Sequence, residues 1–123
     1  MKILIHIVYL FFGLFGGLEV SDDVISALKQ GRSAELVKFF DEKVSVKLIN
    51  QEDVLSKSQA EANLKYFFEK HPVKAFSGHH ASSMNNSMQY ITGTLETSNG
   101  KFRVSILLRR NLVAQFRIEN DND

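Results

Sequence analysis

The sequence has no cysteine among its 123 residues, and it has one proline and no tryptophan. The missing cysteine excludes disulfides, thiol nucleophiles, thiolate metal ligands and lipid attachment through an N-terminal cysteine. Neither charge is in excess, since the formal net charge is +1. Without a basic surplus the chain lacks the electrostatic signature of nucleic-acid binding, and we expect no nucleic acid partner.

What is present is an ordinary globular composition, 44% hydrophobic and 24% charged. A chain of this length and composition predicts one folded domain with its own core. Because disulfides are excluded, apolar packing must supply the stability of that domain.

The N-terminus has the pattern of a secretory signal peptide. Lys2 precedes an apolar run over residues 3–18, and small Gly16 and Gly17 lie near the end of the run. The run is shorter than the roughly 20 residues of a membrane span. We therefore predict a signal peptide over residues 1–18, an exported, periplasmic or secreted protein over 19–123, and no membrane contact after cleavage. An uncleaved membrane anchor is the alternative.

Three helices and one strand are predicted in the first half of the mature chain. Each helix has an apolar face, and a polar connection through Gln51, Glu52 and Asp53 follows the strand. Ser58 and Glu61 form a predicted capping box, and Pro72 ends the long helix at His71. The helices are predicted from Ser21 to Gly31, from Ser33 to Phe40 and from Ser58 to His71, and the strand from Val44 to Leu48.

The second half alternates apolar and polar residues, which is typical of antiparallel strands. Asn99-Gly100 predicts a two-residue turn that pairs Leu95 with Val104 and places Glu96 opposite Arg103. A three-residue loop over 109–111 is predicted next. It pairs Leu108 with Leu112 and Ile106 with Ala114, whereas a two-residue loop would mix the two faces.

A turn at Asn85-Asn86 completes the predicted four-stranded meander. It pairs Phe76 with Leu95 and His80 with Ile91, so His80 points inward and His79 outward. The helices must then cover the apolar face of a curved sheet, with Gly93 as the place where curvature concentrates. The predicted fold class is α+β.

This order of elements resembles the nuclear transport factor 2-like (cystatin-like) fold, a cone of three N-terminal helices packed on a curved antiparallel sheet. The resemblance covers nearly all of residues 19–123. It is carried by the helical segments 23–31 and 35–40 and by the long sheet. Three stretches are more closely similar to a family of uncharacterised exported bacterial proteins with that fold: Ser56–Glu61, Phe67-Phe68 and Ile91–Thr97.

The resemblance implies the fold and little about activity, because this fold supports enzymes, ligand binders and dimerisation modules. Relatives of the ketosteroid isomerase type place an acid or base inside the cone. Here the predicted inner face of the sheet carries no acidic residue. His80 is its one ionisable group, with Tyr66 of the long helix nearby.

We therefore predict a non-catalytic domain that binds a small apolar ligand or a protein partner. A ketosteroid-isomerase-like or hydrolase-like enzyme that uses His80 and Tyr66 is the alternative. We expect no cofactor and no metal, since His79 and His80 are adjacent strand residues that point to opposite faces. The candidate ligand-binding residues are His80, Tyr66, Phe76, Phe102 and Phe116.

The predicted outer face of the sheet is of mixed polarity. Tyr90, Thr92, Leu107 and Val113 would lie on it. Such a face suits a homodimer, and an ordinary solvated sheet face is the alternative.

Overall fold

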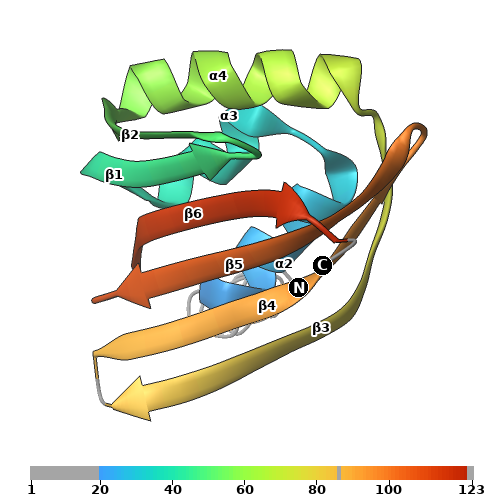
Figure 1. Ribbon diagram of the computed structural model, residues 1–123. Coiled ribbons are helices and arrows are strands. Elements are labelled where there is room, and N and C mark those ends of the chain that lie inside the picture. The colour runs from blue at the N-terminus through green and yellow to red at the C-terminus, as the bar shows by residue number, and fades with distance from the viewer. Residues whose placement is uncertain (1–19, 86, 122–123) are drawn as a thin grey trace, which may run out of the picture.

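Six strands form one curved sheet in the order β2-β1-β6-β5-β4-β3, and helices pack against it (Figure 1). The computed structural model describes residues 20–85 and 87–121, so the predicted signal peptide lies outside the described residues. Within that part of the chain no helix has the length and apolar character to cross a membrane. The elements are α2 (Val20–Gln30), α3 (Ser33–Leu36), the 3-10 helix η1 (Val37–Phe39), β1 (Phe40–Leu48), β2 (Gln51–Ser56), α4 (Lys57–Lys70), β3 (Val73–Asn85), β4 (Met88–Thr97), β5 (Gly100–Arg109) and β6 (Leu112–Asn120).

The α+β class and the three helices agree with the prediction, but the sheet is larger and mixed. The segment Gln51–Ser56, predicted as a connection, is strand β2, which pairs with β1 as an antiparallel hairpin. β1 in turn runs parallel to β6. β2 was missed because it is an edge strand whose polar residues face solvent, which removes the alternation that identifies a strand.

Two helix boundaries also differ from the prediction. The second helix ends early, because buried Phe40 already belongs to β1 and pairs with Val113 of β6. The capping box of α4 uses Ser56 and Gln59 instead of Ser58 and Glu61. Ser56 Oγ accepts a hydrogen bond from Gln59 N at 3.2 Å, and Gln59 Oε1 accepts one from Ser56 N at 3.0 Å. The end of α4 at His71, before Pro72, is as predicted.

The β4–β5 turn consists of Ser98 and Asn99, one position earlier than predicted. Thr97 pairs with Gly100 and Leu95 with Phe102, so Glu96 faces Lys101 and not Arg103. The pairing partner on β5 moves by two residues. An even shift leaves every side chain on its predicted face.

The β5–β6 turn has two residues, which contradicts the predicted three-residue loop. Arg110 and Asn111 both have left-handed backbones, with φ of 53° and 65°, as a type I′ turn requires. A β-bulge at Ala114 follows the turn, because Leu108 pairs with Val113 and Leu107 with Gln115. The bulge returns the later side chains of β6 to the faces predicted for them. Val113 is therefore fully buried.

The β3–β4 hairpin contains a second bulge that reverses the predicted orientation of the histidines. Phe76 pairs with Leu95 as predicted, but Gly78 and His79 together oppose Gly93, and His80 pairs with Thr92. Gly78 has φ of 58°, which a glycine adopts without strain. His80 is consequently exposed on the outer face, while the His79 ring stacks on Phe76 at 5.5 Å between centroids.

The residues predicted on the inner face of the sheet form the core, except for those whose orientation is changed by the β5–β6 turn and by the two bulges. Helices α2, α3 and α4 supply the facing side chains, among them Leu28, Leu36 and Leu64. The inner-face residues confirmed as buried are Ile91, Leu95, Phe102, Val104, Ile106, Leu108, Phe116 and Ile118.

Candidate functional site

The five predicted ligand-binding residues do not form one site. Phe76, Phe102 and Phe116 are core residues with exposed fractions of 3%, 5% and 0%. Tyr66 is 63% exposed and lines a depression beside α4 that does not include His80. The predicted pairing of His80 with Tyr66 is therefore wrong for two reasons: the Gly78-His79 bulge turns His80 outward, and Tyr66 lies on the exposed side of α4, beside the opposite edge of the sheet from β3.

The depression that contains Tyr66, here called the α4 pocket, lies between the second half of α4 and the β1–β2 turn. Its volume is about 260 Å³. In Figure 1 the β1–β2 hairpin runs alongside α4, which brings these segments together. The lining residues are Leu48, Ile49, Gln51, Asn63, Tyr66, Phe67, Lys70 and His71.

Lys70 and Tyr66 lie one helical turn apart on the rim of the α4 pocket. The Lys70 ammonium is 5.3 Å from the centre of the Tyr66 ring, which is within cation–π range. The pair presents an aromatic surface and a positive charge on the same side of the helix. No acidic side chain belongs to the described lining of this pocket.

His71 closes one end of the α4 pocket and is held in place on several sides. Its ring packs on Phe67 at 4.5 Å and on Phe102 at 5.0 Å between centroids. His71 Nδ1 lies 2.6 Å from Asn99 Oδ1. Because a carboxamide oxygen only accepts, His71 Nδ1 is the donor. Asn99 Nδ2 also donates to the Lys70 carbonyl at 2.8 Å, so Asn99 binds the end of α4 through two groups.

Ile49, in the floor of the α4 pocket, has an unusual backbone conformation. Its φ is 60°, a left-handed value that is a genuine outlier for a β-branched residue. Its N–H donates to the Ile118 carbonyl at 2.7 Å, and its side chain packs against the core. Strained residues of this kind persist where the surrounding structure fixes them, and they cluster at binding sites.

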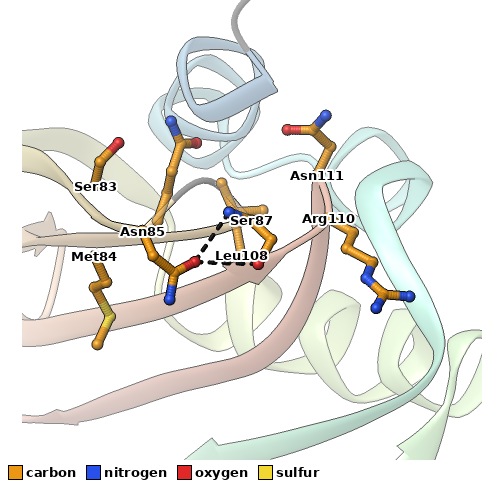
Figure 2. Close-up of a pocket in the computed structure, with 8 residues that line it drawn as sticks. Ser83, Met84, Asn85, Ser87, Leu108, Arg110 and Asn111 are labelled. Atoms are coloured by element: carbon orange, nitrogen blue, oxygen red, sulfur yellow. Dashed lines mark hydrogen bonds between the residues drawn. The ribbon is translucent and has the colours of Figure 1, made fainter.

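A second depression, here called the hairpin-end pocket, lies where the β3–β4 and β5–β6 turns meet (Figure 2). Its volume is about 410 Å³. Figure 2 shows Ser83 and Asn111 pointing toward the side of α2, and Met84 and Arg110 pointing the other way. The lining residues are Ser83, Met84, Asn85, Ser87, Gln89, Leu108, Arg110 and Asn111.

The two turns at the hairpin-end pocket are tied to each other. Asn85 Oδ1 accepts hydrogen bonds from Ser87 N at 2.9 Å and Ser87 Oγ at 3.1 Å. Arg110 N donates to the Ser87 carbonyl at 2.7 Å. Within residues 20–85 and 87–121, the Arg110 guanidinium forms no ion pair.

An ion-pair network of β1, β2 and β6 lies toward the other end of the sheet, on its outer face. Lys47 Nζ lies 2.9 Å from Glu119, and Arg117 bridges Glu119 at 3.6 Å and Glu52 at 3.0 Å. The hydrogen bond from Lys47, together with the charges of Lys47 and Arg117, holds the pKa of Glu119 below its ordinary value of 4.5. In the described ranges no three His, Asp or Glu side chains are placed to hold a metal ion.

The outer face predicted for a homodimer is smaller than expected. Tyr90 and Thr92 are half-buried on it, and Leu107 is 8% exposed. Val113, predicted with them, points into the core because of the Ala114 bulge. A dimer through Tyr90, Thr92 and Leu107 stays a prediction.

Comparison with solved structures identifies the fold. A putative polyketide cyclase from Pseudomonas putida is 11% identical and has a TM-score of 0.65, covering 85% of this chain and 90% of its own. At such low identity the likeness concerns the fold alone. It confirms the nuclear transport factor 2-like fold that the order of helices and strands predicted.

Residues 21–120 match the family described as "Domain of unknown function (DUF4783)", and the chain belongs to that family. A family protein from Bacteroides uniformis is 32% identical over 83% of this chain and 97% of its own, with a TM-score of 0.77. One from Bacteroides ovatus is 34% identical over 82% and 94%, with a TM-score of 0.75. The predicted membership of an uncharacterised family is confirmed. No curated protein matches the chain.

Sequence reasoning missed most of the α4 pocket. The spacing of Tyr66 and Lys70, four residues apart on a predicted helix, places them on one helical face and could have indicated the pair. Ile49 gave no signal, because an isoleucine does not predict a left-handed backbone. The hairpin-end pocket depends on the two-residue turn at Arg110 and Asn111, which the predicted register excluded.

Proposed function

We propose that this domain is an exported, non-catalytic ligand-binding protein whose α4 pocket binds a small molecule with an apolar body and one negative group. The observation that carries the proposal is the placement of Lys70 and Tyr66 above an apolar floor. It refines the small apolar ligand expected from the sequence by adding a charge.

The floor of the α4 pocket supports the apolar part of this ligand. Leu48 and Ile49 pack against the core from one side, and the Phe67 ring is fixed by edge contacts with Phe68 and Phe102 at 5.8 and 5.4 Å. A rigid apolar floor with a few polar groups around it is the usual composition of a small-molecule site. A volume of about 260 Å³ suits one ring or a short aliphatic chain.

The charge on the rim supports the negative group. Lys70 supplies a full positive charge, and Asn63 and Gln51 supply amide donors on the same lining. A carboxylate is the simplest anion that accepts from an ammonium and an amide together. An aromatic or aliphatic carboxylate therefore fits both the floor and the rim.

The same geometry favours binding without catalysis. The enzyme alternative needed His80 and Tyr66 within hydrogen-bonding reach, and the exposed His80 is outside the α4 pocket. The histidine that does line the pocket, His71, uses Nδ1 to bind Asn99. No carboxylate lines the pocket as a general base.

The binding test uses benzoate as the probe and benzyl alcohol as its neutral counterpart. In an NMR titration of the full chain, benzoate is expected to shift the backbone amides of Ile49, Tyr66 and Lys70. Lys70→Gln is expected to weaken benzoate binding about fivefold, the equivalent of about 1 kcal/mol for one exposed charge.

Lys65→Gln is the matched control, since Lys65 is exposed on the same helix but outside the pocket. It should leave the affinity unchanged. Equal binding of benzyl alcohol and benzoate, equal losses in the two lysine variants, or an absence of shifts at the pocket would each overturn the proposal.

Export is tested separately. Residues 1–18 fused to alkaline phosphatase, an enzyme that is active only after export, should give activity, and Leu10→Arg in the apolar run should abolish it. Mass spectrometry of the full-length protein from cells then reads the mature N-terminus. A mature protein that begins at Met1 would contradict the signal peptide and favour the anchor.

A further inference from the structure

His71 lies at the end of the α4 pocket, and one of its two ring nitrogens is already used. His71 Nδ1 donates to Asn99 Oδ1 at 2.6 Å. The orientation of the Asn99 amide is fixed by its other hydrogen bond, from Nδ2 to the Lys70 carbonyl at 2.8 Å. A neutral imidazole carries one proton, so a protonated Nδ1 leaves Nε2 with a free lone pair.

Nε2 of His71 is accessible from the α4 pocket. Within residues 20–85 and 87–121, Nε2 forms no hydrogen bond, and no buried polar side-chain atom lacks a partner, so Nε2 is not buried. His71 belongs to the pocket lining, whereas Asn99 does not. Because the two nitrogens point toward nearly opposite sides of the ring, binding Asn99 through Nδ1 places Nε2 on the pocket side.

His71 and Lys70 lie on the same face of α4. The Lys70 ammonium lies over the Tyr66 ring, and the His71 ring packs on Phe67, the residue after Tyr66. The two side chains are therefore neighbours on the α4 side of the pocket, across from the β1–β2 turn. The lining residues of α4 have the spacing of a single helical face: Asn63, Tyr66, Phe67, Lys70 and His71.

The surroundings of His71 are suited to a positive charge beside an anion. α4 contributes the Lys70 ammonium and the Tyr66 hydroxyl to the pocket lining, and the β1–β2 turn contributes no titratable group to it. Lys101 and Asp121 line a separate depression beyond the β4–β5 turn, which does not include His71. His71 is also the C-cap of α4, where the helix dipole stabilises a cation.

We propose, on the basis of the function proposed above, that His71 is a second anion-binding group of the α4 pocket and that the carboxylate binds together with a proton on Nε2. A neutral Nε2 presents its lone pair to the carboxylate, whereas a protonated Nε2 donates a charge-assisted hydrogen bond. Protonation keeps the bond to Asn99, because Nδ1 is a donor in both states. The pocket therefore binds its anion between an ammonium and an imidazolium, more tightly in mildly acidic solution.

The first experiment follows benzoate binding to the full chain by NMR at pH 5.5 and at pH 8. Benzoate stays ionised and Lys70 stays protonated at both values. Affinity is expected to be about fivefold higher at pH 5.5, the effect of one further exposed charge. His71→Gln keeps an amide near the position of Nε2 but does not titrate, so its affinity should be equal at the two pH values. His80→Gln, outside the pocket, is the matched control and should keep the wild-type difference.

The second experiment follows the His71 ring itself and needs no variant. Ring nitrogen shifts at pH 8 should show a protonated Nδ1 and an unprotonated Nε2. Saturating benzoate should raise the pH midpoint of the His71 titration by about 0.7 units, because coupling between two ligands is reciprocal and a fivefold change in affinity applies to the proton as well. The midpoints of His79 and His80, which lie outside the pocket, should not move.

The outcomes separate this inference from the function on which it rests. Benzoate binding that depends on Lys70 but not on pH, or whose pH dependence survives in His71→Gln, would overturn the role of His71 and leave the proposed function standing. A protonated Nε2 at pH 8, or a His71 midpoint that moves no more than those of His79 and His80, would do the same. If His71→Gln does not fold, the ring titration decides. No benzoate binding at either pH would overturn both.

Discussion

At the end of the sheet covered by α4, aromatic rings fill the space between helix and strands, whereas at the hairpin end the strands extend beyond the helices. Phe67, Phe68, Phe102 and His71 form one ring cluster at the covered end. In β3 every residue from position 78 to 85 is exposed, and Figure 1 shows β3 at the edge of the sheet farthest from α4.

The buried apolar core is concentrated at the covered end, whereas exposed polar side chains predominate at the hairpin end. Buried apolar area stabilises the covered end, and ion pairs reinforce its outer face. The hairpin end contributes less buried area, so its side chains can carry amides, hydroxyls and an arginine without a desolvation cost. Substitutions should therefore have different consequences at the two ends.

The largest contrast is expected between Phe116→Ala and Met84→Ala. Phe116 is fully buried and packs on Phe40 at 5.7 Å between ring centroids. Its truncation should lower the free energy of unfolding by about 3–5 kcal/mol. Met84 is 61% exposed at the hairpin end, and its truncation should change stability by less than about 0.5 kcal/mol. Chemical denaturation monitored by circular dichroism measures both, and similar values would refute the contrast.

A smaller effect is expected at the boundary between the two ends, from Gly93→Ala. A Cβ at position 93 would lie 2.6 Å from the Phe76 ring, so the ring must move out of the core. We expect a loss of about 1–3 kcal/mol from this overpacking. In a double-mutant cycle with Phe76→Leu, which removes the clash, Gly93→Ala should cost clearly less. Additive costs would show that Phe76 is not the obstacle.

Asn99→Ala tests how the C-terminus of α4 is held against the sheet. Asn99 binds both the Lys70 carbonyl and the His71 ring, so its truncation leaves two partners without their hydrogen bonds. The loss should be about 1–2 kcal/mol. Hydrogen exchange should accelerate in the last turn of α4 and remain unchanged at the hairpin end. Uniform acceleration over both ends would contradict a local role.

The smallest effect is expected from Glu119→Gln, and it depends on pH. The pKa of Glu119 is lowered in the folded state, so the ionised carboxylate stabilises the fold above the unfolded value of about 4.5, and this contribution disappears as pH falls through the lower folded pKa. At pH 7 we expect a loss of about 0.5 kcal/mol. Wild type and variant should converge in acid. A difference that grows toward low pH would refute the assignment.

The sequence predicted which face of the sheet each side chain occupies better than it predicted which residues pair across neighbouring strands. Alternation identified the buried side of β4 and β5, and the error at the Asn99-Gly100 turn did no harm because it shifted the partner by two residues. The bulge at Ala114 could not be recognised, because an extra strand residue of this kind leaves little mark in the pattern of residue types. The bulge at Gly78-His79 did have a signal, since a glycine inside a strand is typical of a bulge, but the predicted register did not use it. These bulges reversed the predicted side-chain orientations of His80 and Val113, so neither residue lies on the face for which it was proposed.

The α4 pocket was predictable only in part, for a different reason. Tyr66 was identified as an aromatic residue that could contact a ligand, but its partners depend on tertiary contacts. Lys70 and Ile49 reach the same depression through the packing of α4 on the β1–β2 turn. No local pattern encodes that packing.

The bulge at Ala114 has a consequence for chain length within the family. Leu108 pairs with Val113 and Leu107 with Gln115, so deleting Ala114 would make both strands continuous without changing which side any later residue of β6 faces. From the pairing with β5, we expect that the chain can lose one residue at position 114 and keep its fold. When sequences of relatives are aligned, a one-residue gap should be placed in β6 at this position and not in the turn at Arg110 and Asn111.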